Sequence, residues 1–275
     1  MNGEVSSVVK IVFSDIDGTF LLPDSTVSAR TERAVRQLLA GDIPFVLVSA
    51  RMPEAIYPIT DRLGIHIPII SYSGALVVDA DGQTLFSRTM DADMTARLLD
   101  VIARDFPQVT VNYYAGHHWY VRDENDERVQ TEVRITQARP ERAVWGRCLA
   151  GGIYPNKILI MADPADCERA EKELADAFPS FHVVRSAPFL LEIMDGSVSK
   201  ASGIAVMLDH FGMKPEDALS FGDHYNDLEM LRYTGQSVAM GNAPDEIKRA
   251  AAAVTRSNRE DGLYWYLKQA GLIAG

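Results

Sequence analysis

The chain has 275 residues, of which 47% are hydrophobic, 27 are lysine or arginine and 38 are aspartate or glutamate. This length suffices for one large domain or two smaller ones, each with a buried core. The net charge of −11 opposes binding to nucleic acids and anionic lipid surfaces, because such binding needs clustered basic residues, and the chain has no basic run. We therefore expect no nucleic-acid partner and no membrane association, and the oligomeric state is left open.

Cysteine usage and the N-terminal segment indicate a cellular location. Cys148 and Cys167 form neither a CxxC pair nor a Cys/His cluster with zinc spacing. We therefore expect no disulfide framework, and a reducing cytoplasm is the predicted location. Residues 1–10 include an acidic residue and lack the apolar segment of a signal peptide. No apolar run approaches the roughly 20 residues that a membrane-spanning helix needs.

Strands and helices alternate in the first third of the chain. Apolar, β-branched runs at 8–14, 43–49 and 67–71 predict buried strands. Ser28 is a suitable cap for a helix that stops at Gly41, and Pro53 and Gly64 are suitable ends for a second helix. This β-α-β-α-β order predicts a parallel sheet with helices on both faces.

The pattern changes in the middle of the chain. Asp81-Gly82, between strand-like segments at 75–79 and 83–88, is a hairpin signal. From about residue 85 to 190, hairpin-like strands mixed with helices at 94–105 and 164–177 predict an α+β block. The strand candidates are 109–115, 118–123, 157–162, 182–187 and 189–194. Residues 123–152 are charged or irregular, and no element is predicted there.

The alternation resumes after the middle block. The predicted helices are 200–211, 226–233, 243–251 and 262–269, and the predicted strands are 218–221, 237–240 and 253–255. We therefore predict an α/β protein whose core is a doubly wound, Rossmann-like parallel sheet. Residues 1–83 and 190–275 form this core domain, and residues 84–189 form an inserted α+β domain.

An acidic pair follows the first predicted strand. Asp15 and Asp17 are two residues apart, so both carboxylates point to one side, and Gly18 allows a tight turn. Open parallel sheets bind ligands at the carboxyl ends of their strands. Two close carboxylates repel each other unless a cation lies between them, and Mg²⁺ binds one or two carboxylates together with water and phosphate oxygens. An acidic turn without function is the alternative, because Asp-x-Asp is a common pattern.

Three other segments lie at strand ends or helix starts. They are Ser49-Ala50-Arg51, Val198-Ser199-Lys200-Ala201 and Gly222-Asp223-His224-Tyr225-Asn226-Asp227. A hydroxyl and free amides at a strand end can bind a phosphate oxygen. Each segment also has a structural interpretation when taken alone: an arginine paired with an acid, a solvated surface lysine and a helix N-cap cluster, respectively.

Together with Asp15-Ile16-Asp17-Gly18-Thr19, these segments resemble the ordered motifs of the haloacid dehalogenase-like phosphatases. Segments 240–243 and 258–262 are similar to the Cof-type branch, and the position of the inserted domain implies a C2-type cap. Two positions depart from that branch, which usually has Thr-Gly-Arg where this chain has Ser49-Ala50-Arg51 and Asn-Gly-Ala where it has Ser73-Gly74-Ala75.

The resemblance implies roles for individual residues. Asp15 would be the nucleophile, Asp17 the general acid and base, and Lys200 the cation that neutralises charge in the transition state. Mg²⁺ would be held by Asp15, Asp17 and Asp223, with Asp227 orienting the metal site from the second layer. The implied phosphate-binding groups are the Ile16 amide, Ser49, Ala50, Lys200 and Asn226.

On this resemblance we expect a phosphoric monoester hydrolase that depends on Mg²⁺. It would hydrolyse small phosphorylated metabolites, such as a sugar phosphate, through an aspartyl phosphate on Asp15. A sugar phosphomutase would use the same intermediate and is the first alternative. A non-catalytic phosphate-binding regulatory protein is the second, and the presence of Asp17 argues against it. A structural metal module would not need Ser49, Lys200 or Asn226.

Overall fold

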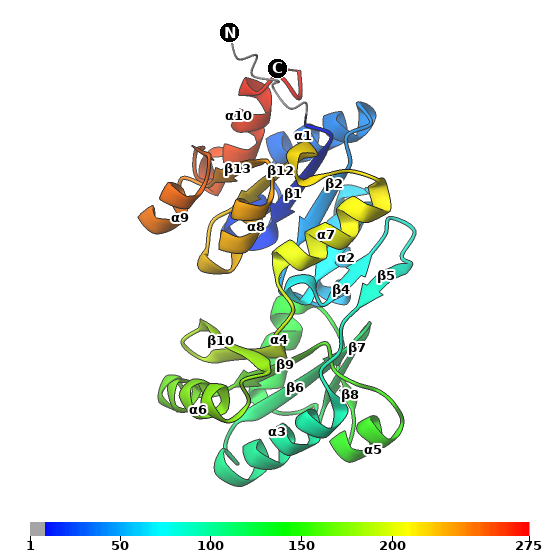
Figure 1. Cartoon of the computed structure of the whole chain (residues 1–275), viewed down its shortest axis with the longest axis vertical. Coiled ribbons are helices and arrows are strands. Elements are labelled where there is room, and N and C mark those ends of the chain that lie inside the picture. Colours follow the sequence, from blue (N-terminus) through cyan, green and yellow to red (C-terminus); the bar gives the residue numbers. More distant parts are fainter. Residues whose placement is uncertain (1–8, 275) are drawn as a thin grey trace. The chain divides into compact units, whose positions relative to one another are not determined.

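The computed structural model describes residues 9–274, so the predictions made for residues 1–8 lie outside the described part of the chain. The chain divides into two compact units (Figure 1). The first unit contains Met1–Ala50, Ile59–Leu85 and Ser199–Gly275, and the second contains Arg51–Pro58 and Phe86–Val198. An α/β organisation with a segment inserted in the middle of the chain is therefore observed.

The first unit is built on a sheet with strand order β14-β13-β12-β1-β2-β3-β4-β5. The pairs from β14 to β3 are parallel, and β4 runs antiparallel to β3. The strands are β1 (Ile11–Asp15), β2 (Phe45–Val48), β3 (Ile69–Ser71), β4 (Leu76–Val78), β5 (Thr84–Ser87), β12 (Ala218–Gly222), β13 (Gln236–Ala239) and β14 (Ala253–Val254). Both faces of β1, β2 and β12 are buried, which explains why their sequences are continuously apolar rather than alternating.

The strand order reverses between β1 and β12. From β1 the chain adds β2 and β3 on one side, and β12, β13 and β14 lie on the other. Because parallel crossover connections are right-handed, the helices of the two halves cover opposite faces. Helix α1 (Ala29–Ala40) packs with α10 (Gly262–Gln269), and α7 (Lys200–Phe211) packs with α8 (Leu228–Tyr233) (Figure 1). The predicted doubly wound core is confirmed, and its switch point is where such sheets bind ligands.

Capping residues set the ends of several helices. The helices are α1 (Ala29–Ala40), α2 (Pro53–Leu63), α7 (Lys200–Phe211), α8 (Leu228–Tyr233), α9 (Asp245–Ala250) and α10 (Gly262–Gln269). Short helical turns are η1 (Ile16–Phe20), η2 (Tyr72–Gly74), η3 (Pro215–Asp217), η4 (Tyr225–Asp227) and η5 (Asn258–Glu260). Ser28 accepts a hydrogen bond from the Thr31 amide at 3.1 Å, as a helix N-cap does, and α1 ends before Gly41 as predicted.

The second unit contains a sheet with strand order β10-β11-β9-β6-β7-β8. It is antiparallel except for the β7–β8 pair. Its strands are β6 (Thr110–Ala115), β7 (His118–Val121), β8 (Glu141–Arg142), β9 (Lys157–Met161), β10 (Phe181–Ala187) and β11 (Leu190–Asp195). Each of the strand candidates in the middle block therefore forms a strand of this sheet.

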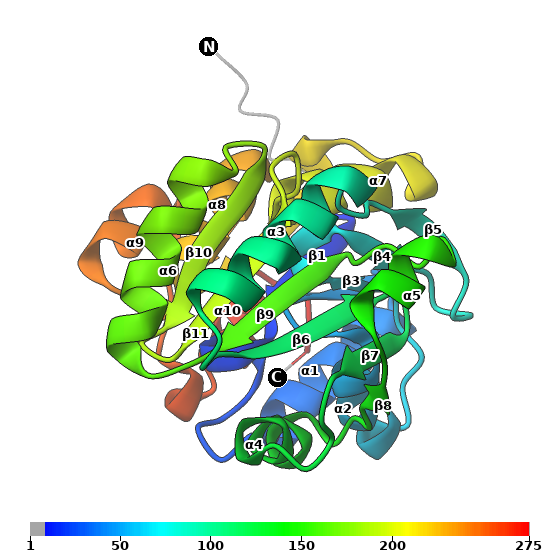
Figure 2. The same cartoon turned by 90° about the horizontal axis from the view of Figure 1, so that it is seen from below.

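Helices cover one face of this second sheet. Figure 2 shows α3 (Ala92–Asp105), α5 (Trp145–Ala150) and α6 (Pro164–Ala177) across that face. Their apolar sides meet the sheet in a common core that includes Leu98, Trp145 and Ile158. Cys148 and Cys167 are buried in the same core as free thiols. Within residues 9–274, none of the helices combines the length and apolarity needed to cross a membrane.

The middle of the chain differs from the prediction in two places. Residues 123–152, for which no element is predicted, form α4 (Glu127–Thr136), β8 and α5. Helix α4 buries only Val129 and Thr136, so its sequence lacks an apolar stripe that would reveal it. The predicted boundary at residue 189 also falls just before β11, which pairs with β9 and β10 in the second sheet. An apolar run predicts a strand without saying which sheet it joins.

Candidate active site

The candidate site lies in the first unit, at the carboxyl ends of β1 and β12. Asp15 is the last residue of β1, and Asp223 directly follows β12. Parallel register aligns Ser14 with Phe221 and Asp15 with Val48. The residues that follow these strands therefore emerge at the same edge of the sheet, at the switch point between β1 and β12.

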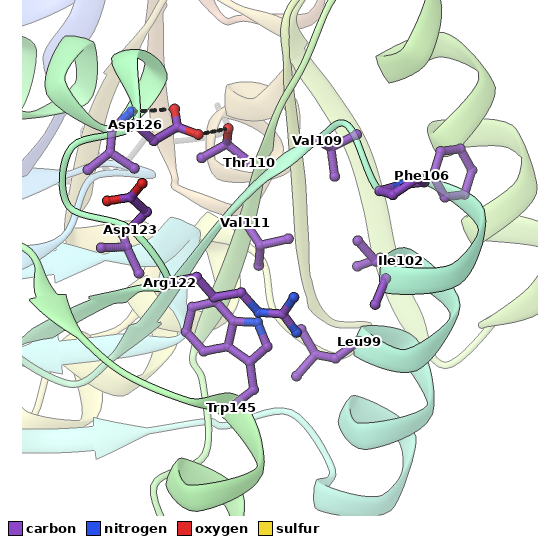
Figure 3. Close-up of a pocket in the computed structure, with 14 residues that line it drawn as sticks. Leu99, Ile102, Phe106, Val109, Thr110, Val111, Arg122, Asp123, Asp126 and Trp145 are labelled. Carbon is purple, nitrogen blue, oxygen red and sulfur yellow. Dashed lines mark hydrogen bonds between the residues drawn. The ribbon is translucent and has the colours of Figure 1, made fainter.

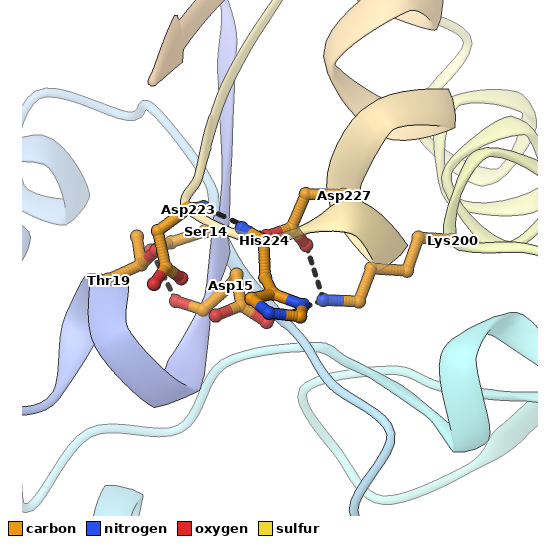
Figure 4. Close-up of polar contacts among 7 residues, drawn as sticks. All are labelled: Ser14, Asp15, Thr19, Lys200, Asp223, His224 and Asp227. Atoms are coloured by element: carbon orange, nitrogen blue, oxygen red, sulfur yellow. Dashed lines mark hydrogen bonds and ion pairs between the residues drawn. The ribbon is translucent and has the colours of Figure 1, made fainter. Parts of the chain in front are cut away.

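A buried lysine joins two aspartates at this edge (Figure 4). The Nζ atom of Lys200 donates to Oδ1 of Asp15 and to Oδ1 of Asp227, at 2.5 Å in each case. Lys200 is only 1% exposed and Asp15 6%. It is the first residue of α7, whose N-cap Ser199 accepts a hydrogen bond from the Ser202 amide, so the helix start directs the lysine toward the cluster. The structure thus brings together three residues that the sequence singled out.

Asp227 organises the loop that carries Asp223. Its Oδ2 atom accepts hydrogen bonds from the backbone amides of Asp223 at 2.9 Å and His224 at 3.0 Å, while its Oδ1 accepts from Lys200. Asp227 is fully buried, and a Cβ atom at Gly222 would lie 2.6 Å from its Cβ. The side chain therefore fixes both the loop and the lysine.

Asp223 is held by two residues that were not predicted as site residues. Thr19 Oγ1 donates to its Oδ1 at 3.0 Å, and Asn242 Nδ2 donates to its Oδ2 at 3.0 Å. Asn242 also donates to the Gly18 carbonyl at 2.9 Å, which links the loops after β1 and β13. Both residues follow parallel strands, so the strand-end rule that identified Asp15 could have found them. Glycine is required at position 18, because φ is +87° and a Cβ would lie 2.2 Å from Asp223 Oδ2.

The cluster has more negative than positive charges. Carboxylate oxygens of Asp15, Asp223 and Asp227 lie within 4.8 Å of one another, and Lys200 donates hydrogen bonds to two of them, Asp15 and Asp227. Burial and the Asp227 charge raise the pKa of Asp15 well above its ordinary value, although Lys200 opposes this shift. Burial and Asp227 also raise the pKa of Asp223 to about 6. Three carboxylates and one ammonium leave an excess of two negative charges, which a divalent cation would neutralise.

Burial by itself would lower the pKa of Lys200, because it disfavours the charged form. Desolvation opposes its charge, but the neighbouring Asp15 and Asp227 outweigh this effect and raise the pKa of the lysine above its usual value. Lys200 is therefore a permanent cation in this site rather than a proton donor.

The other predicted residues lie on the same strand-end loops. Ser49 is buried, its amide donates to the Ile70 carbonyl, and its carbonyl accepts from the Ser73 amide. Ile16 is buried in η1, Ala50 is half-buried and Asn226 is exposed in η4. Asp17 is exposed, and among residues 9–274 its carboxylate is not part of the three-aspartate group. The predicted metal set of Asp15, Asp17 and Asp223 thus has two of its carboxylates together, with Asp227 beside them.

Comparisons with known proteins agree with this fold. Residues 12–267 match the model of the haloacid dehalogenase-like hydrolase family, to which the chain therefore belongs. A Haemophilus influenzae protein, named as a candidate phosphatase, is 36% identical over 94% of this chain and 97% of its own length. The Bacillus subtilis 5-amino-6-(5-phospho-D-ribitylamino)uracil phosphatase YitU is 28% identical over 94% of this chain and 96% of its own.

A solved structure shows the same arrangement of elements. A haloacid dehalogenase-like hydrolase from Bacteroides thetaiotaomicron superposes with a TM-score of 0.85 and 26% identity, covering 95% of this chain and 99% of its own. The family resemblance found in the sequence motifs is therefore confirmed, and so is the expectation of a hydrolase.

Proposed function

We propose that this protein is a Mg²⁺-dependent phosphatase that hydrolyses small phosphomonoesters through an aspartyl phosphate on Asp15. The observation that carries this proposal is the buried Lys200 bridge between Asp15 and Asp227, within a group of three carboxylates at the switch point. The matching family and the relatives named as phosphatases support the reaction class.

The donor set fits Mg²⁺. Asp15, Asp223 and Asp227 supply carboxylate oxygens, which this ion prefers, and their excess negative charge is unfavourable in a buried site without a cation. Asp15 and Asp223 would hold the ion, while Asp227 is committed to two backbone amides and Lys200. The exposed Asp17 is the third proposed contributor. When bound, Mg²⁺ would neutralise charge on the transferring phosphoryl group.

The protein's own residues divide the reaction into two steps. Oδ1 of Asp15 accepts the Lys200 hydrogen bond, so Oδ2 is the oxygen proposed to attack phosphorus. The bond between phosphorus and the leaving oxygen breaks as Asp17 gives that oxygen a proton. Asp17 then takes a proton from water, which attacks phosphorus and breaks its bond to Asp15. The exposure of Asp17 suits a group that must reach both the leaving group and water.

Phosphate oxygens would be bound by groups from several loops. Lys200 supplies positive charge, and the proposed hydrogen-bond donors are the Ile16 amide, Ser49, the Ala50 amide and Asn226. The backbone of Ser49 is anchored to Ile70 and Ser73, so this loop is pre-formed. Donors that are already in place stabilise developing charge without reorganisation.

The proposed substrates are small phosphorylated metabolites. The named relative YitU acts, by its name, on a ribitylamino-uracil phosphate, a sugar-alcohol phosphate joined to a ring. We propose a sugar phosphate or a related metabolite for this chain.

The test is release of inorganic phosphate from a panel of sugar phosphates and related metabolites, with Mg²⁺ and with EDTA. We expect Mg²⁺-dependent release that is lost in Asp15→Asn and kept in Asp209→Asn, an exposed aspartate on α7. Release that is unchanged in Asp15→Asn would exclude the proposed nucleophile. Conversion of a hexose 1-phosphate to the 6-phosphate without phosphate release would indicate a phosphomutase instead.

A further inference from the structure

The turn η2 after β3 has a backbone conformation that its sequence does not favour. Tyr72, Ser73 and Gly74 follow one another with φ angles of +48°, +52° and +107°. Residues other than glycine rarely adopt positive φ, and Tyr72, a bulky side chain with 0% of its surface exposed, is an extreme case. Strained backbone of this kind persists where the surrounding structure enforces it, and it is concentrated at functional sites. The contacts of η2 therefore indicate what the strain serves.

One side of η2 holds the loop that carries Ser49. The Ser73 amide donates to the Ser49 carbonyl at 2.9 Å, and the Ser49 amide donates to the Ile70 carbonyl at 2.8 Å. Val48 is aligned with Ile70 in the parallel register, so an extended backbone at Tyr72 would carry residue 73 past Ser49. The left-handed turn is therefore what places the Ser73 amide against the Ser49 carbonyl.

The other side of η2 packs against the start of α7, which carries Lys200. A Cβ atom at Gly74 would lie 2.1 Å from the Ser199 carbonyl oxygen and 3.2 Å from the Gly203 amide nitrogen. A Cβ atom at Gly203 would in turn lie 2.9 Å from the Gly74 Cα. The two backbones are thus in direct contact. Ser199 is the N-cap of α7 and directly precedes Lys200, so this contact fixes where the lysine leaves the helix start.

The start of α4 in the second unit is held in a different way. There Asp126 accepts hydrogen bonds from the Thr110 hydroxyl (Figure 3) and from the Arg128 amide, both at 2.8 Å. Such side-chain bonds tolerate small shifts of the backbone, because the side chains can rotate to keep them. At Gly74 two backbones meet, and an added methyl group must displace one of them. The start of α7 is therefore sensitive to a single carbon atom.

We propose that Gly74 is a positioning residue for the phosphoryl transfer of the proposed function. Because η2 contacts both the Ser49 loop and the start of α7, it sets where Ser49 and Lys200 lie relative to each other. Both are proposed to bind the same phosphoryl group, and Lys200 also bonds Asp15 and Asp227 (Figure 4). A displacement of about 1 Å in such a geometry can cost about a hundredfold in rate. The effect on rate rests on the proposed function, whereas the effect on the Lys200 bridge does not.

The first test compares phosphate release by Gly74→Ala and Gly82→Ala. Gly82 also has a positive φ, of +81°, but among residues 9–274 no atom lies within 4 Å of a Cβ there, so this variant reproduces the backbone strain without the contact. We expect Gly74→Ala to lower kcat at least about tenfold and to change KM less than about threefold, because Lys200 acts mainly in the transition state. Gly82→Ala should keep kcat within about twofold of the unchanged chain. Equal kcat values in the two variants would overturn the proposal.

Gly203→Ala reaches the same contact from the helix. Gly203 lies inside α7, where alanine favours the helix more than glycine does. Its methyl group would meet the Gly74 Cα at 2.9 Å and the Ile70 Cγ2 at 2.5 Å. A lower kcat in this variant would therefore come from the contact and not from a weakened helix, and we expect a fall of at least about fivefold. An unchanged kcat in Gly203→Ala would contradict the positioning role.

A stability measurement tests the contact without any substrate. Urea unfolding midpoints of the unchanged chain, Gly74→Ala, Lys200→Met and the double variant give the coupling between the turn and the lysine bridge. The midpoint shift caused by Lys200→Met should be about half as large in Gly74→Ala, where the bridge is already weakened, and of full size in Gly82→Ala. If the unchanged chain releases no phosphate from the panel, the proposed function fails and this measurement alone decides the positioning role. Shifts of equal size in the two glycine variants would exclude it.

Discussion

Two buried lysines behave differently in the two units. Lys200 of the first unit is 1% exposed and bonds two aspartates at 2.5 Å, beside a third carboxylate. Lys157 of the second unit is 5% exposed, and its Nζ lies 3.6 Å from Glu192 Oε2. The first set has three carboxylates for one ammonium, whereas Lys157 and Glu192 carry one charge of each sign. Charge imbalance, rather than burial, therefore distinguishes the site that needs a cation and a charged substrate.

The largest effect should follow from removing the lysine of the unbalanced set. Lys200→Met would leave Asp15 and Asp227 without their shared cation. It would also remove the positive charge that neutralises the phosphoryl group in the transition state. We expect kcat for phosphate release to fall about a hundredfold to a thousandfold. Lys214→Met, which removes an exposed lysine, is the control. A Lys200→Met protein with kcat within about threefold of the unchanged chain would contradict this role.

Removing Lys157 should lower the stability of the protein. Lys157→Met leaves Glu192 buried without its ion-pair partner, which should lower the free energy of unfolding by about 3 kcal/mol. Lys157→Met combined with Glu192→Leu replaces the pair by apolar side chains and should recover most of that loss. Urea unfolding of the unchanged chain, the single and the double variant measures this. A double variant as unstable as the single one would show that the loss does not come from a buried Glu192 charge without its partner.

Mg²⁺ should stabilise the protein only by binding at the three aspartates of the first unit. At about one hundred times its Kd, a bound ion adds about 2.7 kcal/mol and raises the melting temperature. The rise should nearly vanish in Asp223→Asn, which removes a proposed ligand, and persist in Asp209→Asn and Lys157→Met. Thermal unfolding with Mg²⁺ and with EDTA tests this without any substrate. A full rise in Asp223→Asn would place the ion elsewhere.

The smallest effect concerns a half-exposed pair in the second unit. His117 Nδ1 lies 2.7 Å from Glu54 Oε1, and this hydrogen bond raises the pKa of His117. A raised folded-state pKa gives stability that is complete below about pH 6.5 and is lost as pH rises through the folded-state pKa. Because both side chains are about one-third exposed, Glu54→Gln should cost only about 0.5 kcal/mol at pH 5.5 and less at pH 8.

The matched control for this prediction is Glu141→Gln. Its partner His118 is 58% exposed, compared with 37% for His117, so screening should make the loss smaller still. Urea midpoints at both pH values measure the difference. A loss in Glu54→Gln that is equal at the two pH values would show that the His117 charge does not contribute.

Most of the fold was predictable because its signals are local. Continuous apolar runs predict the buried strands β1, β2 and β12, and Ser28 with Gly41 predicts the limits of α1. Helix α4 was not predictable, because its polar sequence buries few residues. The helix predicted at 226–233 begins instead as the turn η4, because Asp227 turns inward to bond Lys200 and two amides.

Local sequence signals indicate which residues leave the strands of the core and therefore which carboxylates reach one edge of the sheet. Asp15 was identified by its place at the end of a strand, and Lys200, Asp223 and Asp227 by the order of motifs that resembles the family. The partners of these residues depend on the tertiary fold. The Lys200 bridge joins positions 185 residues apart, and Thr19 and Asn242 reach Asp223 from the loops of two other strands. Such contacts depend on which strands are neighbours and on register, which no local pattern of residues encodes.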